Sequence, residues 1–226
     1  MKIKNVCGHS FVLDFLRLES VILDCGANEG AFARWFDNNH KDAIVYGFEP
    51  DPRLFPLLPE FKNVIFLQLA VSNDNKKIKL HLGELRNSSA YFEETLEQNH
   101  VWADSVSLDK FSEEKSLQYI DLIKLDVEGA EIDILEDLDG VFFESVGQIT
   151  VEFHDFLDHN EVRKIRQIMK DMRARGFVCI KFSHHDYSDV LMINSNLYSL
   201  SLVDIFILFA LKYVRGFSRI LKRILA

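Results

Sequence analysis

The clearest chemical signal in the sequence is an acid followed by a glycine turn, in residues 21–36, VILDCGANEGAFARWF. Asp24 ends a short apolar run, and Gly26 and Gly30 bracket a turn whose backbone N–H groups can approach a ligand. The dinucleotide fingerprint, in contrast, has three glycines and holds a pyrophosphate at a helix N-terminus. Here Asn28 stands where the middle glycine would be, and Asp24 would repel a phosphate. The turn better suits a phosphate-free ligand with an amino group, such as S-adenosylmethionine.

A second acid follows about twenty residues later, the separation at which an acid contacts a ribose in folds of this kind. Glu49 ends the apolar run 44–48 in the string GFEPDP. Its carboxylate can accept hydrogen bonds from both hydroxyls of a ribose, and Pro50 then turns the chain out of the sheet. A lone glycine-rich turn is usually only a turn, but the two features together indicate a nucleoside site.

The third signal lies in residues 119–138, YIDLIKLDVEGAEIDILEDL. The apolar run predicts a buried strand on which Lys124 and Asp126 share one side, because alternate residues face the same way. A buried Lys124 would be costly without a partner, so we expect Asp126 or Glu152 beside it. Asp126 and Glu128 fall at the C-terminal edge of a central strand, where open α/β sheets bind ligands.

The string TVEFH at residues 150–154 offers either a base or a metal site. Glu152 and His154 are two residues apart, so both are expected on one face of a strand over 148–154. Histidine titrates near neutral pH, which makes His154 a candidate general base for a reaction that releases a proton, such as methyl transfer to a hydroxyl. The alternative is a divalent metal held by Asp126, Glu152 and His154, which would lower the pKa of an acceptor hydroxyl. The sequence leaves both open.

A parallel sheet is needed to bring these strand ends together. Apolar runs at 21–23, 44–48, 64–71, 120–125 and 148–154 predict an α/β fold with a mostly parallel sheet. Ala70 and Val71, at the end of the third run, are expected at the adenine edge. Residues 177–182 and 189–193 are expected to close the sheet as an antiparallel pair, after an amphipathic helix over 161–175. Residues 1–20 are expected to form a lead-in strand and a helix without chemistry.

The segment between the third and fourth apolar runs is long for a crossover. Residues 78–82 alternate between apolar and polar, which predicts a half-exposed antiparallel strand. A polar loop to about residue 100 and a strand over 101–108 follow. Because an excursion of roughly fifty residues in a compact domain tends to carry function, we predict a substrate lid here.

Length and charge limit the class of protein. A chain of 226 residues suits one domain, and a net charge of −9 argues against a nucleic-acid partner, leaving a small or neutral acceptor. Cys7, Cys25 and Cys179 are odd in number and widely spaced, so we expect buried thiols in a reducing cytoplasm rather than disulfides or zinc. No cleaved signal peptide is expected, because charged residues interrupt the apolar ones near the N-terminus.

The last thirty residues differ in net charge and in apolar pattern from the domain predicted over residues 1–196. Residues 197–226 contain five basic residues and one acid, a net charge of +4, which leaves −13 on residues 1–196. Their apolar run is too short to span a bilayer. A helix with one apolar and one basic face suits the inner face of an anionic membrane, and the alternatives are packing on a second subunit or on the body of the protein.

The strings DCGANEG, GFEPDP, AVS and IDLIKLDVEGAE, in this order, resemble the FkbM family of S-adenosylmethionine-dependent methyltransferases over about residues 21–154. The resemblance implies a class I methyltransferase (Rossmann-like) fold, with a mostly parallel seven-stranded sheet and helices on both faces. It also implies methyl transfer to oxygen, commonly on a sugar hydroxyl of a glycan or on a secondary metabolite. Carried over by position, the resemblance implies that Asp24, Gly26, Asn28 and Gly30 line the methionine part of the cofactor, that Glu49 holds the ribose, and that residues 126–129 lie between cofactor and acceptor. With their neighbours and the expected adenine edge, the predicted cofactor residues are Asp24, Gly26, Ala27, Asn28, Gly30, Glu49, Pro50, Ala70, Val71 and Asp126. The predicted catalytic residues are His154, Asp126, Glu128, Lys124 and Glu152.

Two other classes of function stay open at the level of sequence. A nicotinamide-dependent oxidoreductase shares the general fold but is disfavoured by Asn28 in place of the middle glycine. A non-catalytic docking protein that keeps the fold would bind no cofactor.

Overall fold

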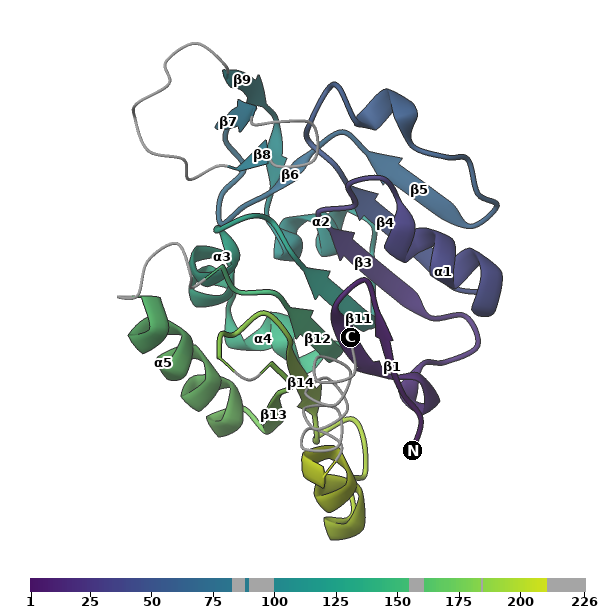
Figure 1. The fold of residues 1–226 in the computed structure, drawn as a ribbon, viewed down its shortest axis with the longest axis vertical. Coiled ribbons are helices and arrows are strands. Elements are labelled where there is room, and N and C mark those ends of the chain that lie inside the picture. The colour runs from purple at the N-terminus through teal and green to yellow at the C-terminus, as the bar shows by residue number, and fades with distance from the viewer. Residues whose placement is uncertain (83–87, 90–99, 155–160, 184, 211–226) are drawn as a thin grey trace, which may run out of the picture.

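The computed structural model describes residues 1–82, 88–89, 100–154, 161–183 and 185–210. Its centre is a seven-stranded sheet (Figure 1). In spatial order the strands are β5 (Val64–Leu67), β4 (Ile44–Phe48), β3 (Val21–Cys25), β11 (Ile120–Leu125), β12 (Val146–Val151), β14 (Val190–Asn194) and β13 (Phe177–Lys181). Strand β14 is antiparallel to the other six strands, which all run in the same direction. Numbered along the chain, the order is 3-2-1-4-5-7-6, and the direction of winding reverses between β3 and β11. The predicted sheet and its closing antiparallel pair are confirmed.

Helices cover both faces of the sheet, as predicted. Alternate residues of each strand point to opposite cores, with Leu23 and Ile123 on one side and Ile22 and Leu122 on the other. The first core includes residues of α2 (Leu108–Glu114), α3 (Glu131–Asp137), α4 (Gly140–Glu144) and α5 (Glu161–Ala174). The second includes residues of α1 (Ala31–Asn39), of the N-terminal strands and of a helix at 202–210. The sheet is therefore the middle layer of three.

The N-terminal segment begins with the predicted strand, but a second strand forms a hairpin with it where a helix was expected to follow. Strands β1 (Ile3–Val6) and β2 (His9–Val12) pair antiparallel around Cys7 and Gly8, which have φ values of 50° and 93°. Two consecutive residues with positive φ make the tight turn that suits the twist of a hairpin. A cysteine in that position is not a recognisable turn signal. A 3₁₀ helix, Leu13–Phe15, follows. Cys7 is exposed at this turn, against the expectation of a buried thiol, whereas the free thiols Cys25 and Cys179 are buried.

The third apolar run forms two strands instead of one. Strand β5 ends at Leu67 and is a half-exposed edge strand. Strand β6 (Ala70–Val71) leaves the main sheet and pairs parallel with β10 (Ser105–Val106). The proline-rich stretch before β5 contains a short 3₁₀ helix, Phe55–Leu57. The break at 68–69 moves Ala70 and Val71 away from the sheet and towards the site.

The predicted excursion contains a small second sheet. Strand β7 (Ile78–Leu82) pairs antiparallel with β8 (Ser88–Ser89) and β9 (His100–Ala103), which confirms the half-exposed strand. The strand predicted over 101–108 is shorter and is followed by β10 and α2, because the pairing is interrupted at Asp104. Most of the predicted polar loop, 83–87 and 90–99, lies outside the described residues. Figure 1 shows this sheet above the C-terminal ends of the central strands.

The C-terminal segment packs against the domain at two points before the description ends. The Tyr198 hydroxyl lies 3.0 Å from the Tyr119 hydroxyl and donates to the Phe15 carbonyl at 3.1 Å. Residues 202–210 are helical, and Leu208 is buried in the second core. Residues 211–226, and the predictions made for them, lie outside the described part of the chain. Within that part, none of the helices is both long and apolar enough to cross a membrane.

Candidate active site

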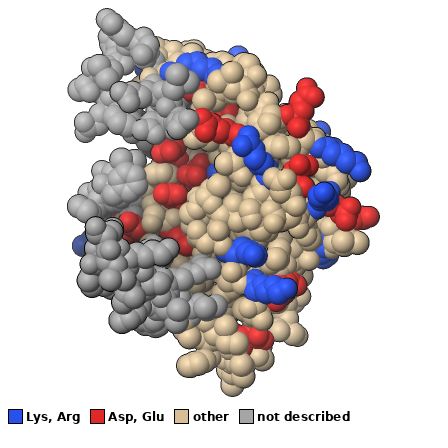
Figure 2. Space-filling model, turned by 45° about the vertical axis from the view of Figure 1, so that its right-hand side comes forward, with Lys and Arg blue, Asp and Glu red and all other residues tan. Residues whose placement is uncertain are grey.

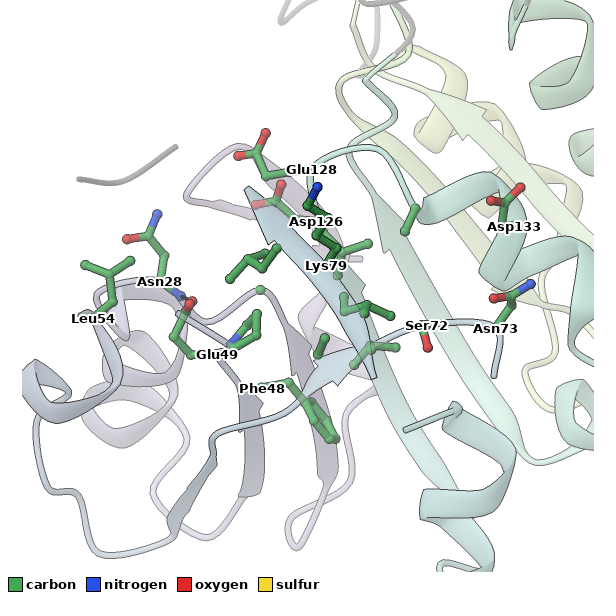
Figure 3. Close-up of a pocket in the computed structure, with 18 residues that line it drawn as sticks. Asn28, Phe48, Glu49, Leu54, Ser72, Asn73, Lys79, Asp126, Glu128 and Asp133 are labelled. Carbon is green, nitrogen blue, oxygen red and sulfur yellow. Dashed lines mark hydrogen bonds between the residues drawn. The ribbon is translucent and has the colours of Figure 1, made fainter. Parts of the chain in front are cut away.

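A cavity of about 350 Å³ opens at the C-terminal edge of β3, β4 and β11 (Figure 3). This edge contains the reversal of strand order, which is where α/β sheets bind ligands. Eight of the predicted site residues line the cavity: Gly26, Asn28, Glu49, Pro50, Ala70, Val71, Asp126 and Glu128. Residues from three motifs that are far apart in the sequence therefore line one cavity.

The glycine turn is shaped by its backbone neighbours. Gly26 has a φ of 85°, and a Cβ added there would lie 1.8 Å from the carbonyl oxygen of Asp126. Only glycine fits this approach of two strand ends. Asn28 has a φ of 49°, and its backbone N–H donates to Glu49 at 2.7 Å. Gly30 and Ala27 are buried and do not line the cavity. Gly30, with a φ of 73°, precedes the first residue of α1. The cofactor contact expected of these two residues stays a prediction.

Glu49 connects the glycine turn to the end of β4. Its carboxylate accepts hydrogen bonds from the backbone N–H groups of Asn28 at 2.7 Å and Asp51 at 2.9 Å. The side chain is 6% exposed, and this burial raises the pKa of the carboxyl group to about 7. Figure 3 shows Glu49 beside Asn28 on one wall of the cavity. The carboxylate is thus positioned before any ligand binds.

Asp24 is fully buried and does not line the cavity, which corrects its predicted place beside a methionine group. It lies opposite Lys124 in the register of β3 and β11, and its carboxylate is 3.2 Å from the Lys124 ammonium group. The same ammonium is 3.2 Å from Asp126 and donates to the Gly26 carbonyl. Burial lowers the pKa of Lys124, but the two carboxylates outweigh it and raise that pKa overall. Burial raises the pKa of Asp24, and the Lys124 ammonium opposes that rise. Asp24 therefore pairs with the lysine beneath the cavity, and Asp126 is the predicted second partner.

His9 is part of the site, although no sequence motif pointed to it. The hairpin places this fully buried ring with Nε2 3.3 Å from Asp126 and 3.9 Å from Glu152. Burial raises the pKa of Asp126, but Lys124 and His9 outweigh it and hold that pKa well below its usual range. Asp126 is therefore ionised and fixed between two donors.

His154 lies between two glutamates. Its Nδ1 is 3.0 Å from Glu131, and its Nε2 is 3.2 Å from Glu128 and 3.9 Å from Asp126. Burial lowers the pKa of His154, but the hydrogen bonds to Glu128 and Glu131 raise it to about 11. At neutral pH the ring is a cation that cannot accept a proton in this arrangement. Strand β12 ends at Val151, before Glu152 and His154, so the two side chains do not share a strand face as predicted.

Glu131 is a second residue that sequence reasoning missed. It is 1% exposed, and its carboxylate accepts from the backbone N–H groups of Val127 at 2.9 Å and Gly129 at 3.1 Å as well as facing His154. It thereby fixes the turn in which Glu128 has a φ of 58°. An acid at the first residue of a helix, where backbone N–H groups lack partners, is the signal that could have found it.

The three metal ligands predicted from sequence belong to two different clusters. One cluster joins His9, Asp126 and Glu152, and the other joins Asp126, Glu128 and His154, each with ligand atoms within 4.8 Å. Both share Asp126, one oxygen of which already faces the Lys124 ammonium and His9. A divalent cation there would be repelled by the charged lysine and by the protonated His154. The donor set does not fit a metal in this arrangement.

The cavity instead suits an organic cation. Figure 2 shows acidic side chains gathered in a recess of the surface, and Glu49, Asp126, Glu128 and Asp133 line the cavity itself. A sulfonium nucleoside carries its positive charge on sulfur, beside apolar groups. Phe48, Leu54 and Val71 supply an apolar lining for such groups. Carboxylates and apolar side chains in one hollow therefore match S-adenosylmethionine in charge and in character.

Comparison with known proteins agrees with the site. The Methyltransferase FkbM domain matches residues 24–179. "2-O-methyltransferase NoeI" of Sinorhizobium fredii is 28% identical over 137 residues, covering 52% of this chain and 56% of that protein. "Hexuronic acid methyltransferase AglP" of Haloferax volcanii is 25% identical over 173 residues, covering 73% and 70%. "Methyltransferase 1" of Beauveria bassiana is 28% identical over 163 residues, covering 61% and 66%.

Among solved structures, the fibrillarin pre-rRNA processing protein of Methanococcus jannaschii is similar with a TM-score of 0.47 and 17% identity, over 85% of this chain and 70% of that one. The chain spans between about half and two thirds of the length of NoeI and of the Beauveria relative. The family match covers more than half of the chain, from the acid of the glycine turn to β13. The protein therefore belongs to the FkbM family of methyltransferases.

Proposed function

We propose that this protein transfers the methyl group of S-adenosylmethionine to a hydroxyl oxygen of a sugar in a glycan. The observation that carries the proposal is the single cavity that unites Asn28, Glu49 and Asp126 beside the Glu128–His154–Glu131 cluster. Family membership supports methyl transfer and disfavours the nicotinamide alternative. The names of NoeI and AglP, which specify a 2-O position and a hexuronic acid, support oxygen and a sugar as the acceptor.

The cofactor would occupy the wall formed by the main sheet. Glu49 would accept hydrogen bonds from the ribose hydroxyls, and the apolar edge at Ala70 and Val71 would contact the adenine. Asp126 and Glu128 would face the positive sulfonium end. The cofactor supplies an electrophilic methyl group. The residues of this chain bind it, orient it and handle the proton of the acceptor.

His154 can act as the base only if its contact with Glu128 is broken. In the reaction a bond forms between the acceptor oxygen and the methyl carbon, the bond from that carbon to sulfur breaks, and the hydroxyl proton leaves. We propose that the acceptor hydroxyl takes the place of Glu128 at Nε2, since Glu128 is 40% exposed and Glu131 is buried. Loss of one carboxylate lowers the pKa of His154 and lets the ring release and accept a proton. Glu131 keeps the Nδ1 proton and the ring orientation.

The acceptor would bind against the second sheet. Lys79 of β7 lines the cavity and extends towards Asp126 and Glu128 (Figure 3). Trp102 of β9 lies directly opposite Lys79 in the strand register, so the two side chains are on the same face. Trp102 is 63% exposed. An exposed aromatic ring offers the apolar face of a sugar ring a surface, and an ammonium group can bind its hydroxyl or carboxylate oxygens.

Two measurements test the proposal. Calorimetry with S-adenosylhomocysteine should show binding, and NAD should not compete with it. Transfer of labelled methyl from S-adenosylmethionine to a panel of neutral and uronic-acid glycans should then identify the acceptor, with His154→Gln as the inactive control. Binding of NAD but not of S-adenosylhomocysteine would contradict the whole proposal. Cofactor binding with transfer only to small non-sugar hydroxyls would contradict the acceptor class alone.

A further inference from the structure

The helix at 202–210 presents a row of large apolar side chains to solvent. Leu202, Phe206 and Phe209 recur at helical spacing, with exposed fractions of 86%, 72% and 42%, and Val203 beside them is 65% exposed. Leu208, on another side of the helix, is fully buried against the domain. The helix is thus anchored by one face while its exposed apolar face lacks cover from the described part of the domain. Soluble proteins leave large contiguous apolar patches uncovered mainly where something binds.

The composition of the residues after helix 202–210 indicates the charge of the surface that the helix binds. Residues 211–226 contain five basic residues, Lys212, Arg215, Arg219, Lys222 and Arg223, and no acid. Their net charge is +5, which leaves −14 on residues 1–210. Tyr213, Phe217, Ile220 and Ile224 are interspersed among them. A segment that combines apolar and basic residues is attracted by a surface that is both negatively charged and able to accept apolar groups.

We propose that the apolar face of helix 202–210 inserts into the surface of an anionic phospholipid bilayer, to which the net charge of +5 in the sequence after the helix attracts the chain. A second copy of the chain fits less well. In a two-fold symmetric dimer the same patch meets itself, which would bring two segments of charge +5 together. A bilayer with anionic headgroups attracts these residues and repels the acidic remainder of the protein, so it also sets an orientation.

That orientation leaves the candidate active site accessible. Figure 1 shows helix 202–210 at the end of the molecule opposite to β7, β8 and β9. A protein attached to a membrane by this helix would therefore turn its cavity away from the lipid surface. The inference is independent of the proposed reaction, because it rests on none of the residues that line the cavity.

Vesicle sedimentation with the full chain tests the inference. Vesicles of phosphatidylcholine with 30–40% phosphatidylglycerol, in the range of about −30 to −50 mV surface potential, should bind the protein, and pure phosphatidylcholine should bind at least tenfold less. The double variant Leu202→Ser, Phe206→Ser should lose at least tenfold in binding to the anionic vesicles. A matched control, Leu18→Ser with Leu57→Ser, removes two apolar side chains that are 71% and 73% exposed elsewhere, and should bind like the unchanged protein.

The contrary outcomes are equally distinct. Equal binding to both kinds of vesicle, or equal losses in the two double variants, would overturn the proposal. So would a protein that ignores vesicles but forms a dimer that Leu202→Ser, Phe206→Ser dissociates, as measured by sedimentation velocity. Circular dichroism and urea denaturation report whether each variant is folded, and neither measurement depends on the cofactor. A failure of the proposed reaction would leave these results unchanged.

Discussion

The inner wall of the cavity, on β3, β4 and β11, differs from the outer wall, on β7, in how its charged groups are held. On the inner wall Glu49 is almost fully buried, and so is Lys124, which lies behind the lining residue Asp126; each faces at least two fixed partners. On the outer wall Lys79 is exposed, and so is Trp102, which lies beside Lys79 in the strand register but outside the cavity. A buried charge must be paired within the folded protein, whereas an exposed charge can bind a ligand. Under the proposed function, the preformed wall would bind the cofactor and the exposed wall would bind the acceptor.

The largest effect should come from removing the central cation of the inner wall. Lys124→Met leaves Asp24 and Asp126 buried without their counter-ion, and such a change typically costs about 3–5 kcal/mol in the free energy of unfolding. Urea denaturation measures it. The matched change on the outer wall, Lys79→Met, removes an exposed charge and should stay within about 0.5 kcal/mol. Equal losses in the two variants would show that the walls do not differ in this way.

A large loss of rate should follow from changing the partner of His154. Glu131→Gln keeps the shape of the side chain but removes the charge that orients the ring and raises its pKa. We expect kcat to fall by about 100-fold, within the range for general base catalysis. The half-maximal rate should also move to lower pH, because His154 would have a lower pKa. Glu136→Gln, an exposed change in the same helix, is the control. A lower rate with an unmoved pH profile would mean that Glu131 has only a structural role.

The same cluster should make stability depend on pH in a specific direction. The pKa of His154 is raised from 6.5 to about 11 in the folded protein, so its stabilising contribution is complete below pH 6.5 and is lost as pH rises to about 11. Between pH 7 and 10.5, the unchanged protein should therefore lose more free energy of unfolding than His154→Gln. If the free energy of unfolding changed with pH in the same way in both proteins, the pairing of His154 with Glu128 and Glu131 would be contradicted.

A smaller effect is expected at Glu49, on cofactor binding. Glu49→Gln loses a charged acceptor for the ribose, worth about 1.5–3 kcal/mol, which is roughly tenfold or more in affinity. Because burial raises the pKa of Glu49 to about 7, the unchanged protein should bind S-adenosylhomocysteine more tightly at pH 8.5 than at pH 5.5. Calorimetry should show no such dependence in Glu49→Gln, and Glu60→Gln, at an exposed position, should behave like the unchanged protein. If Glu49→Gln leaves the affinity for S-adenosylhomocysteine unchanged, Glu49 does not bind the ribose.

The inner wall was largely predictable from sequence because its residues stand at the ends of strands. Apolar runs fix where strands end, and the two-residue period places Lys124 beside Asp126. The same reasoning failed for Asp24, because register with Lys124 turns its carboxylate away from the cavity. It also failed for His9, which reaches the site only because a hairpin folds back over the sheet. Long-range pairing of this kind leaves no periodic trace in the chain.

The outer wall shows a different limit. The alternation of residues 78–82 predicted a half-exposed strand, and β7 confirms it. Nothing in that alternation tells which strand lies beside β7, so the pairing of Lys79 with Trp102 could not be derived. Nor could the division of residues 64–71 into β5 and β6, since both parts are apolar and a break in a strand needs no special residue.

The smallest expected effect, and the sharpest test of the outer wall, is at Trp102. Trp102→Ala removes an exposed aromatic surface, and an aromatic contact of about 0.5–1.5 kcal/mol corresponds to a rise in the KM for a sugar acceptor of roughly fivefold. The dissociation constant of S-adenosylhomocysteine and the free energy of unfolding should stay the same, because Trp102 is 63% exposed and lines no part of the cavity. Trp102→Phe should restore much of the affinity. If KM for the acceptor were unchanged while cofactor affinity fell, the second sheet would belong to the cofactor site, and the two walls would not divide the ligands between them.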